Sequence, residues 1–357
     1  MKRFHIARRI VLALGGTILV VAGAGVVGGC IFAAPGYRGP PSDHFDGESF
    51  HNQIATPHEG LGAVLRWQWS RQPGPWPGHP DASPGPRPPA RVGRGALRVT
   101  FVNHATVLIQ MDGLNVLTDP IWSERASPLG WVGPKRRRPP GLRFEDLPPI
   151  DLVLVSHNHY DHLDLPTLAR LARAHRPRIV TGLGNGLLLA KKGIPGAVEL
   201  DWWKAIALGP ELTLTAVPSQ HFSGRGLGDR DETLWAGFVI SGPAGKVYFA
   251  GDTGMGPHFR QIRERFGPMR LAVLPIGAYR PEWFMSPIHV SPDQALEAHY
   301  LLGAGTSVAM HYGTFALADD GEDEAPARIR ALLARAADDD RHPRFWLLGF
   351  GEGRDVP

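Results

Sequence analysis

The sequence places four potential metal ligands within six positions: His157, His159, Asp161 and His162. They follow Asp151–Val155, an apolar run that is typical of a fully buried strand. Because alternate residues at a strand end point to one side, His157 and His159 can hold one metal ion while Asp161 and His162 hold a second. Imidazole and carboxylate ligands without thiolate suit Zn²⁺, with Mn²⁺ or Fe²⁺ as alternatives. The competing interpretation is a polar loop whose side chains only hydrogen-bond one another, but four such groups packed together would repel when protonated.

This segment resembles the H-x-H-x-D-H signature of the metallo-β-lactamase fold superfamily. In that superfamily the other ligands are a distant histidine, an aspartate that bridges two ions, and a last histidine, each at a strand end. Candidates stand in the same order here: His221 in the stretch P-S-Q-H, Asp252 in G-D-T-G, and His311 in H-Y-G-T-F. Alone, each would be interpreted as a turn residue, and it is their order after the motif that makes them candidates.

The resemblance implies two Zn²⁺ ions per chain, in an α/β fold. The fold is expected to be an αββα sandwich of two mixed sheets with outer helices, preceded by an N-terminal hydrophobic segment. The implied ligands are His157, His159 and His221 for one ion, Asp161, His162 and His311 for the other, and Asp252 as the bridge.

Composition narrows the class of protein independently of these residues. Hydrophobic residues make up 43% of the 357 positions and charged residues 20%, which excludes a disordered tail and a polytopic membrane protein. The 44 glycines and 34 prolines favour a loop-rich fold with strands over a helical bundle. A formal charge of +4 is too weak to indicate nucleic acid as a partner. The single cysteine, Cys30, excludes an internal disulfide, a zinc ribbon and an iron–sulfur cluster.

Regular hydrophobic alternation begins at Leu97 and predicts the elements that must position the ligands. Asp112-Gly113 is a strong hairpin signal between two of them. The predicted strands are Leu97–Asn103, Val107–Met111, Leu114–Leu117, Asp151–Val155, Arg178–Thr181, Glu211–Val217, Leu234–Ser241, Lys246–Ala250, Leu271–Pro275, Thr306–His311 and Phe345–Leu348. The predicted helices are Pro166–Ala174, Asn185–Lys192, His258–Phe266, Pro292–Leu302 and Ala325–Ala337. Strand meanders mixed with single helices predict two sheets with helices outside them.

The N-terminus is predicted to reach a membrane. Four basic residues precede Ile10–Tyr37, which has no charged side chain and holds an apolar stretch long enough to cross about 30 Å of hydrocarbon as a helix. The basic residues favour a bacterial inner-membrane anchor with the catalytic domain outside the cytoplasm. Two alternatives stay open: a lipoprotein attached through Cys30 in V-G-G-C, and a cleaved secretory signal.

Three regions follow from these patterns. Residues 1–35 form the anchor or signal segment, 36–96 a Pro/Gly-rich strap and linker packed on the domain, and 97–357 the metallo-β-lactamase-like catalytic domain. The turn-rich and aromatic part of the strap is Gly36–Asn52, and Gln72–Gly95 is expected to be irregular and extended.

Finer features resemble the N-acylphosphatidylethanolamine-hydrolysing phospholipase D family, from about Gly36 to Leu317. The stretches that carry this resemblance are Ser42–Gly47, Asn103–Gln110, Leu117–Pro128, Gly133–Pro140, Ser156–Asp164, Pro275–Met285 and Met310–Leu317. His289 matches a family histidine near the substrate phosphate. The implied partner is a phospholipid substrate at a membrane surface; the oligomeric state stays open, with a homodimer as one option.

The expected reaction is phospholipase D hydrolysis, which gives phosphatidic acid and N-acylethanolamine. Two zinc ions lower the pKa of a shared water, so that a bridging hydroxide oriented by Asp252 can attack phosphorus. His289 is the candidate to supply a proton to the leaving alkoxide or to steady the phosphoryl oxygens. His104 is interpreted as a structural or outer-shell residue.

Two surface features and two other functions complete the expectations. Trp283-Phe284-Met285 can reach a lipid interface, and the basic run Lys135–Arg138 can attract anionic headgroups or serve only as a solvated loop. The alternative functions are hydrolysis of another ester, such as a lactone or β-lactam, and a non-catalytic, metal-stabilised envelope module. Seven candidate ligands argue against the module, because four usually close a structural zinc site.

Overall fold

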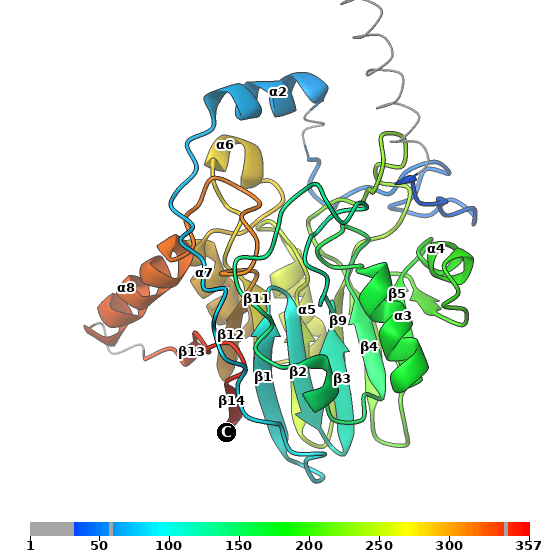
Figure 1. Cartoon of the computed structure of the whole chain (residues 1–357). Coiled ribbons are helices and arrows are strands. Elements are labelled where there is room, and N and C mark those ends of the chain that lie inside the picture. The colour runs from blue at the N-terminus through cyan, green and yellow to red at the C-terminus, as the bar shows by residue number, and fades with distance from the viewer. Residues whose placement is uncertain (1–31, 57–59, 339–341) are drawn as a thin grey trace, which may run out of the picture.

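The structure is a computed structural model that describes residues 32–56, 60–338 and 342–357. Within these ranges the strands form two sheets of seven, which face each other (Figure 1). The first sheet has the order β14-β1-β2-β3-β4-β5-β6 and the second has the order β13-β12-β11-β10-β9-β8-β7. Both sheets mix parallel and antiparallel neighbours. The expected sandwich of two mixed sheets is therefore confirmed.

The first sheet holds the first six described strands and the last one, β14. Their bounds are β1 Leu97–Asn103, β2 Thr106–Met111, β3 Leu114–Thr118, β4 Leu152–Val155, β5 Arg178–Gly182, β6 Val198–Leu200 and β14 Gly353–Asp355. The second sheet has β7 Ala205–Ala207, β8 Thr213–Val217, β9 Gly237–Gly242, β10 Gly245–Phe249, β11 Leu271–Pro275, β12 Thr306–Met310 and β13 Phe345–Trp346.

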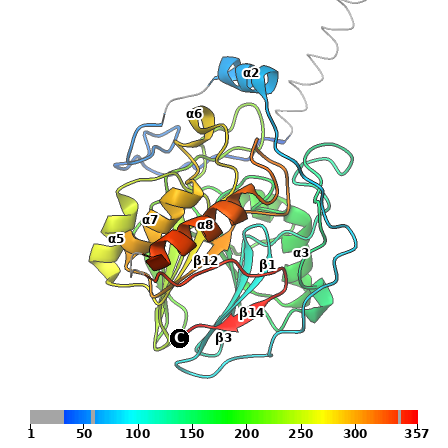
Figure 2. The ribbon, with the colours of Figure 1, turned by 90° about the vertical axis from the view of Figure 1, so that its left-hand side faces the viewer.

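Helices cover the outer face of each sheet, as Figures 1 and 2 show. Those on the first sheet are α3 Leu165–Ala174 and α4 Gly186–Lys191. Those on the second sheet are α5 His258–Phe266, α7 Pro292–Leu302 and α8 Glu324–Asp338. The remaining helices are η1 Phe144–Asp146, α6 Glu282–Met285 and α2 Leu61–Ser70, and α2 lies above α6 in both views.

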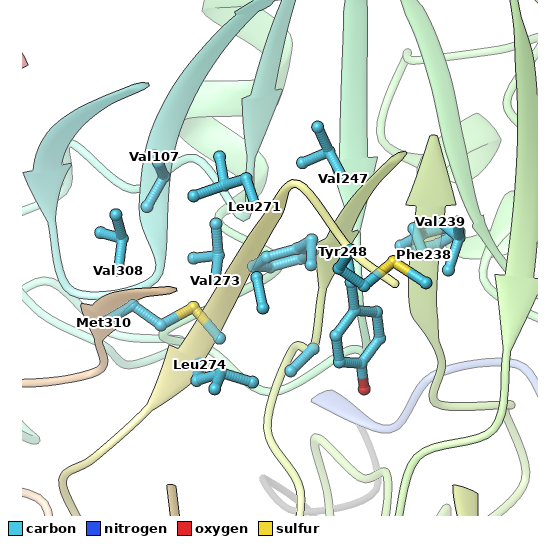
Figure 3. Packing of buried hydrophobic residues seen from close by; sticks show 14 of the residues in the cluster. Val107, Phe238, Val239, Val247, Tyr248, Leu271, Val273, Leu274, Val308 and Met310 are labelled. Atoms are coloured by element: carbon cyan, nitrogen blue, oxygen red, sulfur yellow. The ribbon is translucent and has the colours of Figure 1, made fainter. Parts of the chain in front are cut away.

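The main hydrophobic core lies between the two sheets. Figure 3 shows side chains from both sheets in this cluster, including Val107 of β2 and Val273 of β11. A smaller core joins the other face of the first sheet to α3 and α4, through residues such as Leu171 and Leu189. Since both faces of the central strands are covered, these strands are buried throughout.

Most of the predicted elements lie within a few residues of their observed bounds. The prediction for β9 began too early, at Leu234. Leu234 and Ala236 donate their amides to carbonyl groups of Leu183 and Ser156, at the end of the first sheet, instead of joining the β9 ladder. The short edge strands β6, β7 and β14 and the helix α2 were not predicted. A strand of three residues is too short to show an alternating pattern.

The segment before the first sheet contributes to the core. Phe45 and Phe50 are 1% exposed within the main cluster, and the amide of Tyr37 donates to the carbonyl of Glu232. Most of the predicted anchor, including Cys30, lies outside the described residues. In the ranges that the structure describes, no helix has the length and apolar character needed to cross a bilayer.

Candidate metal centre

The candidate ligands converge because the strands that carry them end at the same edge of the sandwich. In the second sheet β10, β11 and β12 run parallel, and β8 and β10 are both antiparallel to β9, so that β8 shares their direction. His221, Asp252 and His311 therefore leave this sheet at one edge. The loop after β4 reaches them from the first sheet, since the Ala236 amide that leads into β9 donates to the carbonyl of Ser156.

Three histidines form the first group. His159 Nδ1 lies 2.8 Å from His157 Nε2 and 3.3 Å from His221 Nε2. All three rings lie edge to face with one another. Their nitrogens therefore point at a common position.

A second group lies beside the first and contains both carboxylates. His162 Nε2 is 3.2 Å from Asp161 Oδ2, and His311 Nε2 is 3.6 Å from the same oxygen. Asp252 Oδ2 is 3.1 Å from both of these imidazole nitrogens and 3.8 Å from His221 Nε2. Asp252 thus touches both groups, the position expected of a bridging ligand.

Distances and unpaired atoms both fit the binding of metal ions. With metal–nitrogen bonds of 2.0–2.1 Å, two ligands of a tetrahedral ion are about 3.3 Å apart, close to the separations in both groups. His162 Nε2, His311 Nε2 and Asp252 Oδ1 are buried without a hydrogen-bond partner. A buried polar atom without a partner is costly, and a cation would satisfy these atoms.

Outer hydrogen bonds select the tautomers that leave the inward nitrogens free. His221 Nδ1 donates to the carbonyl of Ile288 at 2.9 Å, and His162 Nδ1 donates to Asp119 Oδ2 at 2.6 Å. His157 Nδ1 contacts Ser156 Oγ at 2.9 Å, and this hydroxyl in turn donates to Asp119. Each ring then presents the lone pair of Nε2 to the cluster.

The electrostatics differ between the two groups. Burial lowers the pKa of His157 and His221 well below the ordinary value and that of His159 to about 4, which keeps these rings neutral. For His311 burial also acts to lower the pKa, but Asp252 and Asp161 outweigh it and raise the pKa to about 9. Without a cation, protonated imidazole balances the carboxylates, so metal binding would release protons.

His289 lies beside this cluster. Its Nδ1 is 4.0 Å from Asp252 Oδ2 and is buried without a partner, and its ring centre is 5.1 Å from that of His221. Burial lowers the pKa of His289 to about 4. A neutral imidazole at this place can donate one hydrogen bond to a bound oxyanion, whereas it is a poor source of a proton.

Two residues outside the predicted ligand set complete the surroundings. His104 Nε2 lies 2.9 Å from Asp161 Oδ2, in keeping with an outer-shell role. Asp119 was not singled out by sequence reasoning, although the stretch that contains it was. This fully buried carboxylate accepts hydrogen bonds from the Ser156 amide at 2.7 Å, from its hydroxyl at 2.6 Å and from His162. The signal that could have identified it is an aspartate directly after a buried strand.

The surface predictions hold only in part. Met285 is 7% exposed and belongs to a small core with Phe284, so of its triplet only Trp283, at 41%, is well exposed. In the basic run, Arg136 donates to the carbonyls of Ser123 and Ile121, so that it holds loops together instead of facing solvent.

Comparisons with known proteins agree with this geometry. A sequence profile described as "Beta-lactamase superfamily domain" matches residues 114–312, more than half of the chain. The N-acyl-phosphatidylethanolamine-hydrolyzing phospholipase D 1 of Caenorhabditis elegans is 38% identical over 267 residues, which cover 72% of this chain and 75% of the worm protein. The mitochondrial N-acyl-phosphatidylethanolamine-hydrolyzing phospholipase D of Saccharomyces cerevisiae is 35% identical over 215 residues, 58% of this chain and 46% of the yeast protein.

A solved structure supports the fold alone. Igni18, a metallo hydrolase from the archaeon Ignicoccus hospitalis, superimposes with a TM-score of 0.56 at 23% identity, over 73% of this chain and 99% of the archaeal chain.

Proposed function

This chain belongs to the metallo-β-lactamase superfamily and, within it, to the N-acylphosphatidylethanolamine-hydrolysing phospholipase D family, and we propose that it is a dizinc phospholipase D. It is a hydrolase of that superfamily. The proposed reaction cleaves N-acylphosphatidylethanolamine to N-acylethanolamine and phosphatidic acid. The observation that carries the proposal is the position of Asp252, whose Oδ2 contacts imidazoles of both groups of ligands.

Seven side chains of this chain would hold the two ions, and the phosphate of the substrate must lie beside them. His157, His159 and His221 would hold one ion; Asp161, His162 and His311 would hold the other; Asp252 would bridge them. Bound divalent ions supply a nucleophile at neutral pH and offset the charge of the phosphodiester.

The mouth of the centre can orient the phosphate. A phosphoryl oxygen held at the metal centre beside His289 would find the imidazole N–H of this ring as a donor, because its Nδ1 faces the centre, 4.0 Å from Asp252 Oδ2. The departing alkoxide needs a proton, and solvent is a better source than His289, whose pKa is lowered by burial.

Exposed apolar side chains on α2 and α6 form a ridge that can present the centre to a lipid surface. On α2, Trp69 is 94% exposed and Leu65 is 59% exposed, while Trp67 stacks on Phe284 of α6 with ring centres 5.2 Å apart. Arg66 lies over the exposed Trp283. Indole rings and guanidinium groups together suit the headgroup region of a membrane.

The proposed reaction can be tested with a substrate panel. Purified protein, freed of metal and reloaded with Zn²⁺, is expected to release N-acylethanolamine from N-acylphosphatidylethanolamine. Turnover by the metal-loaded Asp252→Asn variant should fall by more than about 10–100-fold, which is the usual loss when a residue that only hydrogen-bonds a metal ligand is replaced. Asp146→Asn is the control, because Asp146 is also a buried carboxylate, 7% exposed, but pairs with Arg87 and Arg143. Turnover confined to a lactone or a β-lactam would refute the proposal, as would full turnover by Asp252→Asn.

The role of the ridge can be tested separately through the physical state of the substrate. Trp69→Ala should raise KM for substrate in vesicles and leave KM for a short-chain, monomeric analogue unchanged. Trp131→Ala removes another exposed indole, 77% exposed in the loop after β3, and should change neither value. Equal effects of the two variants would argue against α2 as the lipid-facing element.

A further inference from the structure

One ligand of the proposed centre lacks an outer hydrogen bond in the structure. His311 directs Nε2 toward Asp161 and Asp252, so that a metal-bound ring would carry its hydrogen on Nδ1. His311 Nδ1 is buried and has no partner. Metal-binding histidines almost always donate this second N–H to a carboxylate, a carbonyl or a water. An acceptor for His311 is therefore expected nearby.

Asp320 is a buried carboxylate on the same side of the molecule. Its Oδ2 accepts the amide of Ala278 at 3.0 Å, while its Oδ1 is buried without a partner. His311 comes close to this carboxylate, because the two residues border the same small space. Both residues line one cavity of about 10 Å³, together with Ala278 and Phe315. This volume is close to the least that holds one water molecule.

The backbone fixes this arrangement. His311 has a φ of 62°, and its amide donates to the carbonyl of His104. Gly277 packs against the His311 carbonyl so closely that a Cβ there would collide with it. The loop after β11 thus brings Ala278, and with it Asp320, against the end of β12.

We propose that Asp320 is a positioning residue for the metal centre, which accepts the Nδ1–H of His311 through one water molecule in this cavity. The inference rests on the metal centre of the proposed function. A carboxylate in this place fixes the tautomer of His311 and makes its Nε2 a stronger ligand. The neighbouring Asp319 serves a different purpose, because it accepts hydrogen bonds from Trp67 and Arg71 and from the amide of Gln72.

The Asp320→Asn variant tests the proposed contact with His311 separately from the hydrogen bond that Asp320 accepts from the Ala278 amide. An asparagine can still accept the amide of Ala278 with its oxygen, but it turns an NH₂ group toward the cavity. Titration of the metal-free full chain with Zn²⁺ against a chelator should show one of two sites weakened by about 10–100-fold, the usual effect of losing an outer-shell partner. Asp319→Asn is the matched control and should bind both ions as the wild type does.

Several outcomes overturn the proposal. Two unchanged affinities in Asp320→Asn would do so, and so would an equal loss in Asp319→Asn. If Asp320→Asn does not fold, a crystal structure of the zinc-loaded wild type decides: a water within hydrogen-bond distance of His311 Nδ1 and Asp320 Oδ1 supports the proposal, and its absence refutes it. Because the readout is metal affinity, a wild type that binds two ions but cleaves no phospholipid would contradict only the proposed function.

Discussion

Asp119 offers the sharpest test of how the protein holds the metal centre. Its Oδ1 accepts the amide of Ser156, while its Oδ2 accepts both the Ser156 hydroxyl and His162 Nδ1–H. Asparagine has nearly the same shape but only one acceptor oxygen. In Asp119→Asn, that oxygen can face either the Ser156 amide or His162, and one donor must then meet the NH₂ group.

The free energy lost when one of these donors is left unpaired sets the expected loss of metal affinity. In the metal-free variant, we expect the oxygen to face the Ser156 amide and His162 to carry its hydrogen on Nε2, where it can donate to Asp161 or Asp252. Metal binding needs the Nε2 lone pair, so the asparagine must turn and leave a buried amide unpaired at about 1–3 kcal/mol. A penalty of that size weakens binding about 5–150-fold.

The measurement is a competition titration of metal-free protein with Zn²⁺ and a chelator. The larger loss should fall on the ion held by His162, which donates directly to Asp119, because His157 of the other group reaches Asp119 only through the Ser156 hydroxyl. Asp146→Asn again serves as the control for removal of a buried charge. Unchanged affinity for both ions in Asp119→Asn would show that Asp119 does not select the tautomer of His162, and the reasoning would then be wrong.

Two further predictions concern stability. Removing the metal with a chelator should lower Tm reversibly, because a ligand present at 100 times its Kd stabilises the folded state by about 2.7 kcal/mol; an unchanged Tm would show that no ion binds the folded chain tightly. Although burial opposes it, hydrogen bonds to Asp201 and Asp43 raise the pKa of His44 above 6.5. The stabilisation is therefore complete below about pH 6.5 and disappears as the pH rises through the folded pKa, so that the Tm difference between wild type and His44→Gln should be larger at acidic pH than at alkaline pH. A difference independent of pH would refute this.

The sequence was sufficient for the parts of the fold that follow local rules. The strands β1 and β11 and the helices α5 and α7 match their predicted bounds, because each is a strongly patterned segment with clear ends. The edge strands β6, β7 and β14 were not predicted, since three residues carry no period and their pairing depends on a neighbour that is distant in sequence. Helix α2 starts without a side-chain cap and is held mainly by Trp67, so little in its own sequence marks it as a helix.

The candidate site likewise has residues that were predicted from the sequence and residues that were not. The sequence motif identified ligand types, and the family resemblance supplied the distant ones, His221, Asp252 and His311, which the structure brings to the motif. Neither the motif nor the resemblance singled out Asp119 or Asp320, although the place of Asp119 directly after a buried strand was a usable signal. Each acts through a hydrogen bond or a cavity between segments that only the folded chain brings together: Asp119 meets Ser156 and His162, and Asp320 borders one cavity with His311.

The distribution of the ligands over both sheets links metal binding to the packing of the sandwich. The motif after β4 comes from the first sheet, whereas His221, Asp252 and His311 come from the second. Without a cation, the buried Asp161 and Asp252 depend on protonated imidazoles for compensation, and several inward atoms stay unpaired. A bound ion satisfies ligands from both sheets at once, so any separation of the sheets at this edge must break metal–ligand bonds. Metal binding should therefore protect the ends of β4 and β12 from hydrogen exchange together, although they lie in different sheets.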